Sequence, residues 1–101
     1  MHQDPETLYI FNNAAIVVVP VINVDGFKQI SDNYMNYGNW SYTRKNLHQY
    51  SFQSTCDTMQ QSGVDLQRNY GFNFGLDDVG SSSDPCSDNY RGPAAFSEPE
   101  T

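Results

Sequence analysis

The sequence is poor in basic side chains and in histidine, and each shortage excludes a class of function. Five Lys and Arg stand against twelve Asp and Glu, which gives a formal net charge of −7. This balance disfavours binding to nucleic acid or to an anionic membrane surface, because both need clustered positive charge. The two histidines, His2 and His48, fit neither HExxH nor HxxE spacing. Because a catalytic zinc ion takes about three protein ligands, we expect no complete zinc site in this chain.

Long apolar runs and metal-binding cysteine pairs are also missing. The longest apolar run, residues 14–22, is too short to span a bilayer. The first five residues do not have the basic and then apolar character of a signal peptide. Cys56 and Cys86 stand thirty positions apart without a CxxC motif, so they offer a possible disulfide rather than a zinc knuckle. A disulfide would place the chain in an oxidising compartment.

Length and aromatic content indicate part of a folded body. A chain of 101 residues allows one small domain at most. Its hydrophobic content of 38% is low for a globular protein, whereas 14% of aromatic residues is high for a disordered tail.

Local signals predict one helix and one strand in the first quarter of the chain. Asp4 and Pro5 suit a helix start, since Asp can accept from free backbone amides and Pro fits the first turn. We expect this helix to close near residues 12–13. Residues 14–22 are continuous and β-branched, which favours a strand covered on both faces that ends near Pro20. Residues 23–26 then carry turn chemistry.

The rest of the chain is predicted to be mostly loop. Residues 28–62 show no sustained period and are interpreted as a long ordered loop, and residues 75–93 as a second one. Ser97 and Glu100 have the spacing of a helix capping box with Pro99 inside the first turn. The chain ends at Thr101, before such a helix could form, which we interpret as truncation.

Arg68 is the candidate binding residue that side-chain chemistry alone suggests. A guanidinium can hold a carboxylate through two parallel hydrogen bonds. An Arg beside Asp65 is more often a structural ion pair, so both interpretations stay open. A thiolate–imidazole pair of Cys56 and His48 is a weaker alternative. A calcium site among the aspartates of residues 77–88 is also a weaker alternative. Their spacing is not that of an EF-hand.

Several motifs together resemble one family, the zinc metallocarboxypeptidases of the pancreatic A/B-like group, peptidase family M14. The matching segments follow the family's order over nearly the whole chain: Gln3-Asp4-Pro5, residues 20–27 (Pro-Val-Ile-Asn-Val-Asp-Gly-Phe), Arg44-Lys45-Asn46, residues 63–70 and residues 81–101.

This resemblance implies an α/β fold, with a mixed sheet flanked by helices and long loops. Residues 1–101 would be the central part of a carboxypeptidase catalytic domain, truncated at both ends. The implied activity is hydrolysis of the C-terminal residue of peptides by a zinc-activated water. The metal ligands would lie outside this chain, so it would be inactive alone. Peptide C-termini are the implied partners, and the extracellular space or secretory pathway is the implied location.

The resemblance also assigns roles to individual residues. Arg68 matches the family's Arg that holds the substrate's terminal carboxylate, and Gln67 stands where its partner is usually Asn. Arg44 belongs to the basic segment and is expected to bind substrate. Leu47 stands where an Arg that polarises the scissile carbonyl is expected. Cys56 and Cys86 resemble a disulfide pair found in many members.

Three hypotheses follow. The first is a fragment of a secreted zinc carboxypeptidase. The second is a non-catalytic binding remnant that keeps carboxylate recognition through Arg68 and has lost the metal. The third is an incompletely folded polypeptide without activity.

Overall fold

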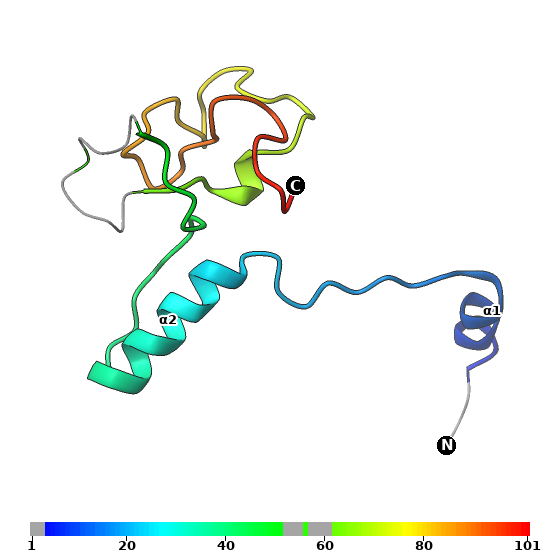
Figure 1. Cartoon of the computed structure of the whole chain (residues 1–101). Helices are drawn as coiled ribbons and strands as arrows, with labels where there is room; N and C mark the ends of the chain where they lie inside the picture. Colours follow the sequence, from blue (N-terminus) through cyan, green and yellow to red (C-terminus); the bar gives the residue numbers. More distant parts are fainter. Residues whose placement is uncertain (1–3, 52–55, 57–61) are drawn as a thin grey trace.

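The computed structural model describes residues 4–51, 56 and 62–101 of the chain. This part contains helix α1 (Pro5–Asn13), helix α2 (Val24–Tyr37) and the 3-10 helix η3 (Leu66–Arg68) (Figure 1). Within these residues, β-pairing is limited to isolated bridges, Lys45 with Asp65 and Ser82 with Tyr90. The mixed sheet that the resemblance implies is therefore not confirmed.

Helix α1 forms where the sequence predicts it. The Asp4 carboxylate accepts a hydrogen bond from the Thr7 backbone amide at 3.1 Å, and Pro5 is the first helical residue. Ala14 ends the helix in an extended conformation. The helix lies at the far end of an extended segment, and none of its nine described residues is buried (Figure 1).

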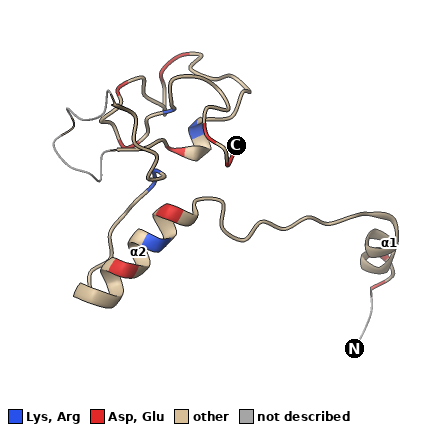
Figure 2. Cartoon of the chain, viewed as in Figure 1, with Lys and Arg blue, Asp and Glu red and all other residues tan. Residues whose placement is uncertain are grey.

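The strand predicted for residues 14–22 is wrong for this structure. The segment runs as an unpaired coil between the two helices, and Figure 2 shows it without any charged residue. Val17 is 87% exposed and Val18 is 72% exposed. Strand propensity is realised only where a neighbouring backbone supplies hydrogen bonds and side-chain cover, and the described part of the chain places no strand there.

Helix α2 replaces the turn predicted at residues 23–26 and the first part of the loop predicted from residue 28. The Asn23 side chain accepts from the Gly26 backbone amide at 2.9 Å and caps the helix. Gly38, with φ of 67°, ends it in the left-handed conformation that glycine adopts without strain. The capping chemistry of Asn serves a helix start as well as a turn, which is why the turn prediction failed.

In the remainder of that predicted loop, residues 38–50 hold no helix or strand, and the bridge at Lys45 is their one regular pairing among the described residues. The prediction also covered residues 52–55 and 57–61, which lie outside the described residues. The second predicted loop, residues 75–93, is confirmed as turns and bends, with one isolated bridge between Ser82 and Tyr90.

Residues 44–51 and 62–101 fold back on one another and form what we call the C-terminal body (Figure 1). Its buried apolar side chains are Val64, Leu66 and Tyr90. Polar residues are buried beside them: Lys45, Asn46, Ser62, Asp65, Asn69 and Glu98. Buried polar groups need hydrogen-bond partners, so this body depends on specific polar contacts as much as on apolar packing.

Asn69 is the clearest of these polar centres. It is fully buried, and its Nδ2 donates to the backbone carbonyls of Arg91 and Ala94 at 2.8 and 3.0 Å. Its Oδ1 accepts from the Glu98 backbone amide at 3.2 Å. One side chain therefore ties the end of η3 to residues 91–98.

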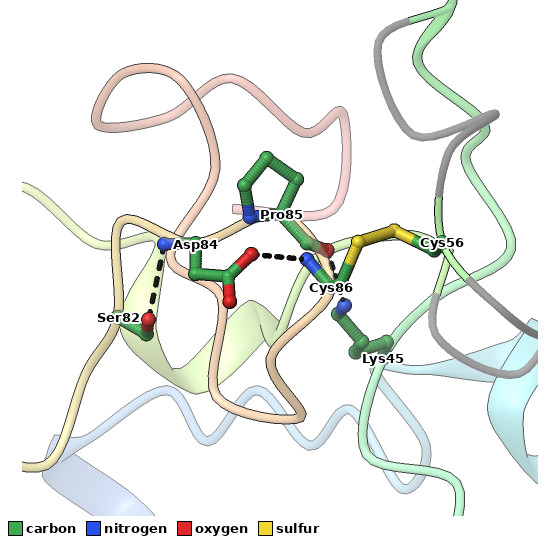
Figure 3. The surroundings of a disulfide bond; sticks show 6 residues. All are labelled: Lys45, Cys56, Ser82, Asp84, Pro85 and Cys86. Carbon is green, nitrogen blue, oxygen red and sulfur yellow. Dashed lines mark hydrogen bonds between the residues drawn. A yellow bond between two sulfur atoms is a disulfide. The ribbon is translucent and has the colours of Figure 1, made fainter.

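The disulfide between Cys56 and Cys86 is present, with Cα atoms 5.4 Å apart (Figure 3). The turn that carries Cys86 is also held by hydrogen bonds. The Lys45 ammonium donates to the Pro85 carbonyl at 2.9 Å, and the Cys86 amide donates to the Asp84 carboxylate at 3.0 Å. The disulfide expected from the resemblance is confirmed, and it excludes Cys56 as a free thiolate.

The predicted capping box does not form. Glu100 is exposed, and the Ser97 hydroxyl donates instead to the Glu98 carboxylate at 3.1 Å. The Thr101 amide bonds to the Glu98 carbonyl at 3.2 Å, which closes a turn rather than a helix.

The whole chain is extended for its length. Its radius of gyration is 17.9 Å, and its principal extents are 56, 39 and 22 Å. A compact domain of about 100 residues has a radius of gyration of about 13 Å. Among the described residues, no helix is long and apolar enough to cross a bilayer.

Candidate functional site

A cleft of about 500 Å³ opens between residues 19–23 and the C-terminal body. Its volume falls within the range of about 300 to 1,000 Å³ that is usual for small-molecule sites. Its lining combines apolar walls with a few polar groups: Val19, Pro20, Ile22, Asn23, Arg44, Asp65, Leu66, Gln67 and Tyr70.

Asp65 is the centre of this cleft's polar side. Its side chain is 2% exposed, and its Oδ2 lies 3.2 Å from Arg44 Nε and 3.2 Å from a terminal nitrogen of the same guanidinium. Arg68 Nε lies 3.9 Å from the same oxygen. The Gln67 backbone amide donates to Oδ1 at 3.1 Å. A buried carboxylate requires such partners, and here they are the three residues expected to bind substrate.

Arg44 is placed by its backbone as well as by its ion pair. Asn23 Nδ2 lies 3.0 Å from the Arg44 carbonyl and 3.1 Å from the Lys45 carbonyl, while Asn23 also caps α2. The Arg44 side chain remains 49% exposed. Its guanidinium is thus fixed on one side by Asp65 and open to solvent on the other.

Gln67 and Arg68 lie in η3, which Asp65 caps. Gln67 lines the main cleft and also a neighbouring polar hollow of about 160 Å³, and Arg68 lines the hollow. The Arg68 side chain is 40% exposed. The structure therefore brings Arg44, Gln67 and Arg68 to one carboxylate, with the two guanidinium groups on adjoining openings.

Leu47 does not line the cleft among the described residues, and it is 46% exposed. The resemblance gave position 47 to an Arg that would act on the scissile carbonyl. In this structure the cleft's guanidinium comes from Arg44, three residues earlier.

Metal ligands do not gather in the described part of the chain. No group of three His, Cys, Asp or Glu side chains comes together in residues 4–51, 56 and 62–101. His48 Nδ1 lies 2.8 Å from a Glu98 carboxylate oxygen, and His2 lies outside the described residues. Asp78 pairs with Arg91 instead of joining a calcium site. The described residues therefore do not fit a zinc ion.

Glu98 and Asn46 are buried polar residues, and no motif in the sequence marks their burial. Glu98 is 2% exposed and Asn46 1% exposed, and Asn46 Nδ2 donates to Glu98 Oε2 at 2.7 Å. These residues are 52 positions apart. The Ser-x-x-Glu spacing directed attention to Glu100, and no local pattern signals a contact over such a separation.

Comparison with known proteins identifies the class. The family model described as zinc carboxypeptidase matches residues 1–101, and the chain belongs to this family. It is 34% identical over 91 residues to a carboxypeptidase B of Astacus astacus, which covers 90% of this chain and 26% of that protein. It is 36% identical over 84 residues to the mast cell carboxypeptidase A of Homo sapiens, which covers 83% of this chain and 17% of that protein.

A solved structure supports the same relationship. The carboxypeptidase A from Helicoverpa armigera superposes with a TM-score of 0.55 at 39% identity, over 81% of this chain and 17% of that one. A carboxypeptidase-like domain fragment is thereby supported as the fold. The chain spans about a quarter or less of the length of these relatives.

Proposed function

We propose that this chain is the central, carboxylate-binding part of a zinc-dependent metallocarboxypeptidase, which removes the C-terminal residue of peptides. The observation that carries the proposal is the convergence of Arg44, Gln67 and Arg68 on the buried Asp65 beside a cleft. The zinc ligands would be supplied by residues other than those described, so no step through the metal is assigned to this chain.

The charges of the site suit a single carboxylate. Two guanidinium groups face one buried carboxylate, which leaves a surplus of one positive charge where Arg44 and Arg68 are still partly exposed. A peptide's terminal carboxylate would match that surplus and accept charge-assisted hydrogen bonds. The Gln67 side-chain amide, one methylene longer than Asn, could donate a further hydrogen bond. The apolar walls favour a peptide over a small inorganic anion.

Arg44 and Arg68 receive different roles in this proposal. Arg68 would hold the terminal carboxylate from the polar hollow. Arg44, inside the main cleft, would stabilise negative charge that develops on the scissile carbonyl. Removing one such donor in enzymes costs on the order of a hundredfold in rate. This assignment places the charge at position 44 and makes an Arg at position 47 unnecessary.

We propose the secretory pathway or the extracellular space as the location. The support is the Cys56–Cys86 disulfide, since such bonds persist in oxidising compartments and are rare in the cytosol.

The experiment that tests the proposal compares two ligands that differ only in the terminal charge. Binding of Nα-acetyl-phenylalanine and of its carboxamide would be measured by NMR titration of the chain. We expect the carboxylate to bind more tightly, and Arg68→Ala to weaken it about tenfold, as for loss of a charged hydrogen bond. Arg68→Lys should keep the charge and recover part of the affinity.

Lys28→Ala is the matched control. Lys28 is 72% exposed on α2 and pairs with Asp32, so its removal deletes one positive charge away from the cleft. We expect less than a twofold change. Equal binding of acid and amide, or equal losses in Lys28→Ala and Arg68→Ala, would contradict the proposal.

The binding-remnant hypothesis predicts the same affinities and differs only in turnover. The longest natural form of the protein, loaded with zinc, would be assayed for release of phenylalanine from hippuryl-phenylalanine. Release supports the peptidase, and tight binding without release supports the remnant.

A further inference from the structure

The Glu98 carboxylate is fully enclosed by the folded chain. Its side chain is 0% exposed. One oxygen accepts from Asn46 Nδ2 at 2.7 Å and lies 2.8 Å from His48 Nδ1. The other accepts from the Tyr50 hydroxyl at 2.6 Å and from the Ser97 hydroxyl at 3.1 Å. None of these contacts has a part in the substrate site described above.

The group is ionised at neutral pH. Burial alone raises the pKa of Glu98, but the hydrogen bonds from Tyr50, Asn46, His48 and Ser97 together lower this pKa below its ordinary value. The titratable groups that face the carboxylate are His48, Tyr50 and Tyr90. Burial, and then contact with the Glu98 charge, raise the pKa of each tyrosine, so both phenols stay protonated.

Asn46 connects this carboxylate to the segment that carries Arg44. While Asn46 Nδ2 donates to Glu98, its Oδ1 accepts from the Val64 amide at 2.9 Å, and its own amide donates to the Val64 carbonyl at 3.0 Å. The next pairing of the same two segments is the bridge between Lys45 and Asp65. Asn46 therefore fixes the register that sets Arg44 against Asp65.

The Glu98 backbone contacts the segment that carries Arg68. Its amide donates to Asn69 Oδ1 at 3.2 Å, and Asn69 directly follows Arg68 at the end of η3. The Asn69 amide in turn bonds to the Leu66 carbonyl at 3.2 Å. One residue thus contacts both segments from which the two cations of the site project.

We propose that Glu98 is a positioning residue for the substrate site: through Asn46 and Asn69 it holds the Arg44 and Arg68 segments at the spacing that a peptide's scissile carbonyl and terminal carboxylate require. The inference rests on the proposed function for its ligand, and on the hydrogen bonds alone for its geometry. Glu98 does not touch the substrate.

The first test is a double-mutant cycle with Nα-acetyl-phenylalanine as the probe. Glu98→Gln keeps the shape of the side chain but removes its charge. It also places an amide NH₂ group against the donors that now bond to the carboxylate. We expect it to weaken binding about tenfold in the natural chain, as for loss of a hydrogen bond to a charged group. In an Arg44→Ala background it should weaken binding much less, because its main target is gone.

Glu100→Gln is the control, since Glu100 is an exposed carboxylate two residues away. It should leave the affinity unchanged. An equal loss from Glu98→Gln with and without Arg44 would show a general structural effect and overturn the proposal.

The second test does not depend on substrate binding. Arg44 Nε donates to Asp65, so its N–H resonance reports the pair directly. We expect this resonance to move in Glu98→Gln and to stay in place in Glu100→Gln. If the natural chain fails to bind the probe, the proposed function fails, while this resonance still decides the role of Glu98. An unmoved Arg44 signal in Glu98→Gln would overturn it.

A milder variant covers the case in which Glu98→Gln does not fold. Tyr50→Phe deletes one hydrogen bond to Glu98 and leaves the carboxylate on Asn46. Since that hydrogen bond lowers the pKa of Glu98, the pH at which the Arg44 resonance changes should move upward in Tyr50→Phe. The same midpoint in both proteins would contradict the proposal.

Discussion

Removing the Cys56–Cys86 disulfide should loosen the C-terminal body without affecting α2. The bridge closes a sequence separation of 30 residues. By the chain-entropy relation, a loop of that length stabilises the folded state by about 3.7 kcal/mol. A small domain has a total stability of about 5 to 15 kcal/mol, so this is a large fraction of it.

Hydrogen exchange measures this effect at individual amides. The Asn46 amide bonds to the Val64 carbonyl, and the Asp65 amide bonds to the Tyr90 carbonyl, both inside the C-terminal body. In the double Cys→Ser variant, we expect their protection factors to fall by about 500-fold, the equilibrium equivalent of about 3.7 kcal/mol.

The Gly38 amide is the internal control, because it bonds to the Tyr34 carbonyl at 2.9 Å within the end of α2. Its exchange should stay within a factor of about two. A fall of less than about fivefold at Asn46 and Asp65 would refute the reasoning, since the polar contacts would then hold the body without the covalent link.

Four further substitutions, two at Asn23 and one each at Gly63 and Gly38, test how backbone geometry shapes the site. Asn23→Ala should cost about 1 kcal/mol of helix stability, seen as lower helicity by circular dichroism, while Asn23→Asp should keep the cap and lose only the donations to the carbonyls of residues 44 and 45. Gly63→Ala should abolish the protected amides of the C-terminal body, because a Cβ there would lie 1.9 Å from the Asn46 carbonyl oxygen at a φ of 86°. Gly38→Ala, with a φ of 67° but open space around it, should cost about 1 kcal/mol and leave those amides protected; equal damage from both glycine changes would contradict the steric argument.

The pH dependence of the Glu98 cluster follows from the direction of its pKa shift. The pKa of Glu98 in the folded chain lies below the ordinary value of about 4.3. Its contribution to stability is therefore fully present above that value and is lost as the pH falls through the folded pKa.

Local signals predicted only what local chemistry determines. Helix α1 follows from Asp4 and Pro5, which act within one turn of themselves. Helix α2 carried comparable signals, an Asn before its first residue and a Gly after its last, together with Phe27 and Ile30 three positions apart on one face. Tyr and Asn residues interrupt the apolar period of this helix, and an Asn followed by Asp and Gly is as typical of a turn as of a helix cap.

The candidate site shows the same division. The Cys56–Cys86 disulfide expected from the family's pattern is present, while the role that its motif assigns to Arg68 stays a prediction. The pairing of Arg44 with Asp65 was not predicted, because the two residues stand 21 positions apart. Glu98 depends on a contact across 52 positions. Such pairings are set by how the loops fold back, which neither periodicity nor spacing encodes.

The uncovered segment between the two helices has a consequence for self-association of the chain. Residues 14–19 are six consecutive uncharged, mostly β-branched residues without proline, and Val17 is 87% exposed. Segments of this length and composition stack into cross-β fibrils when several copies meet. Pro20 ends the run, because proline cannot donate a backbone hydrogen bond, and it limits the stacking segment to these six residues. At high concentration the chain would therefore self-associate first through residues 14–19. The resulting assembly would be amyloid-like, and the C-terminal body would stay folded outside its cross-β core.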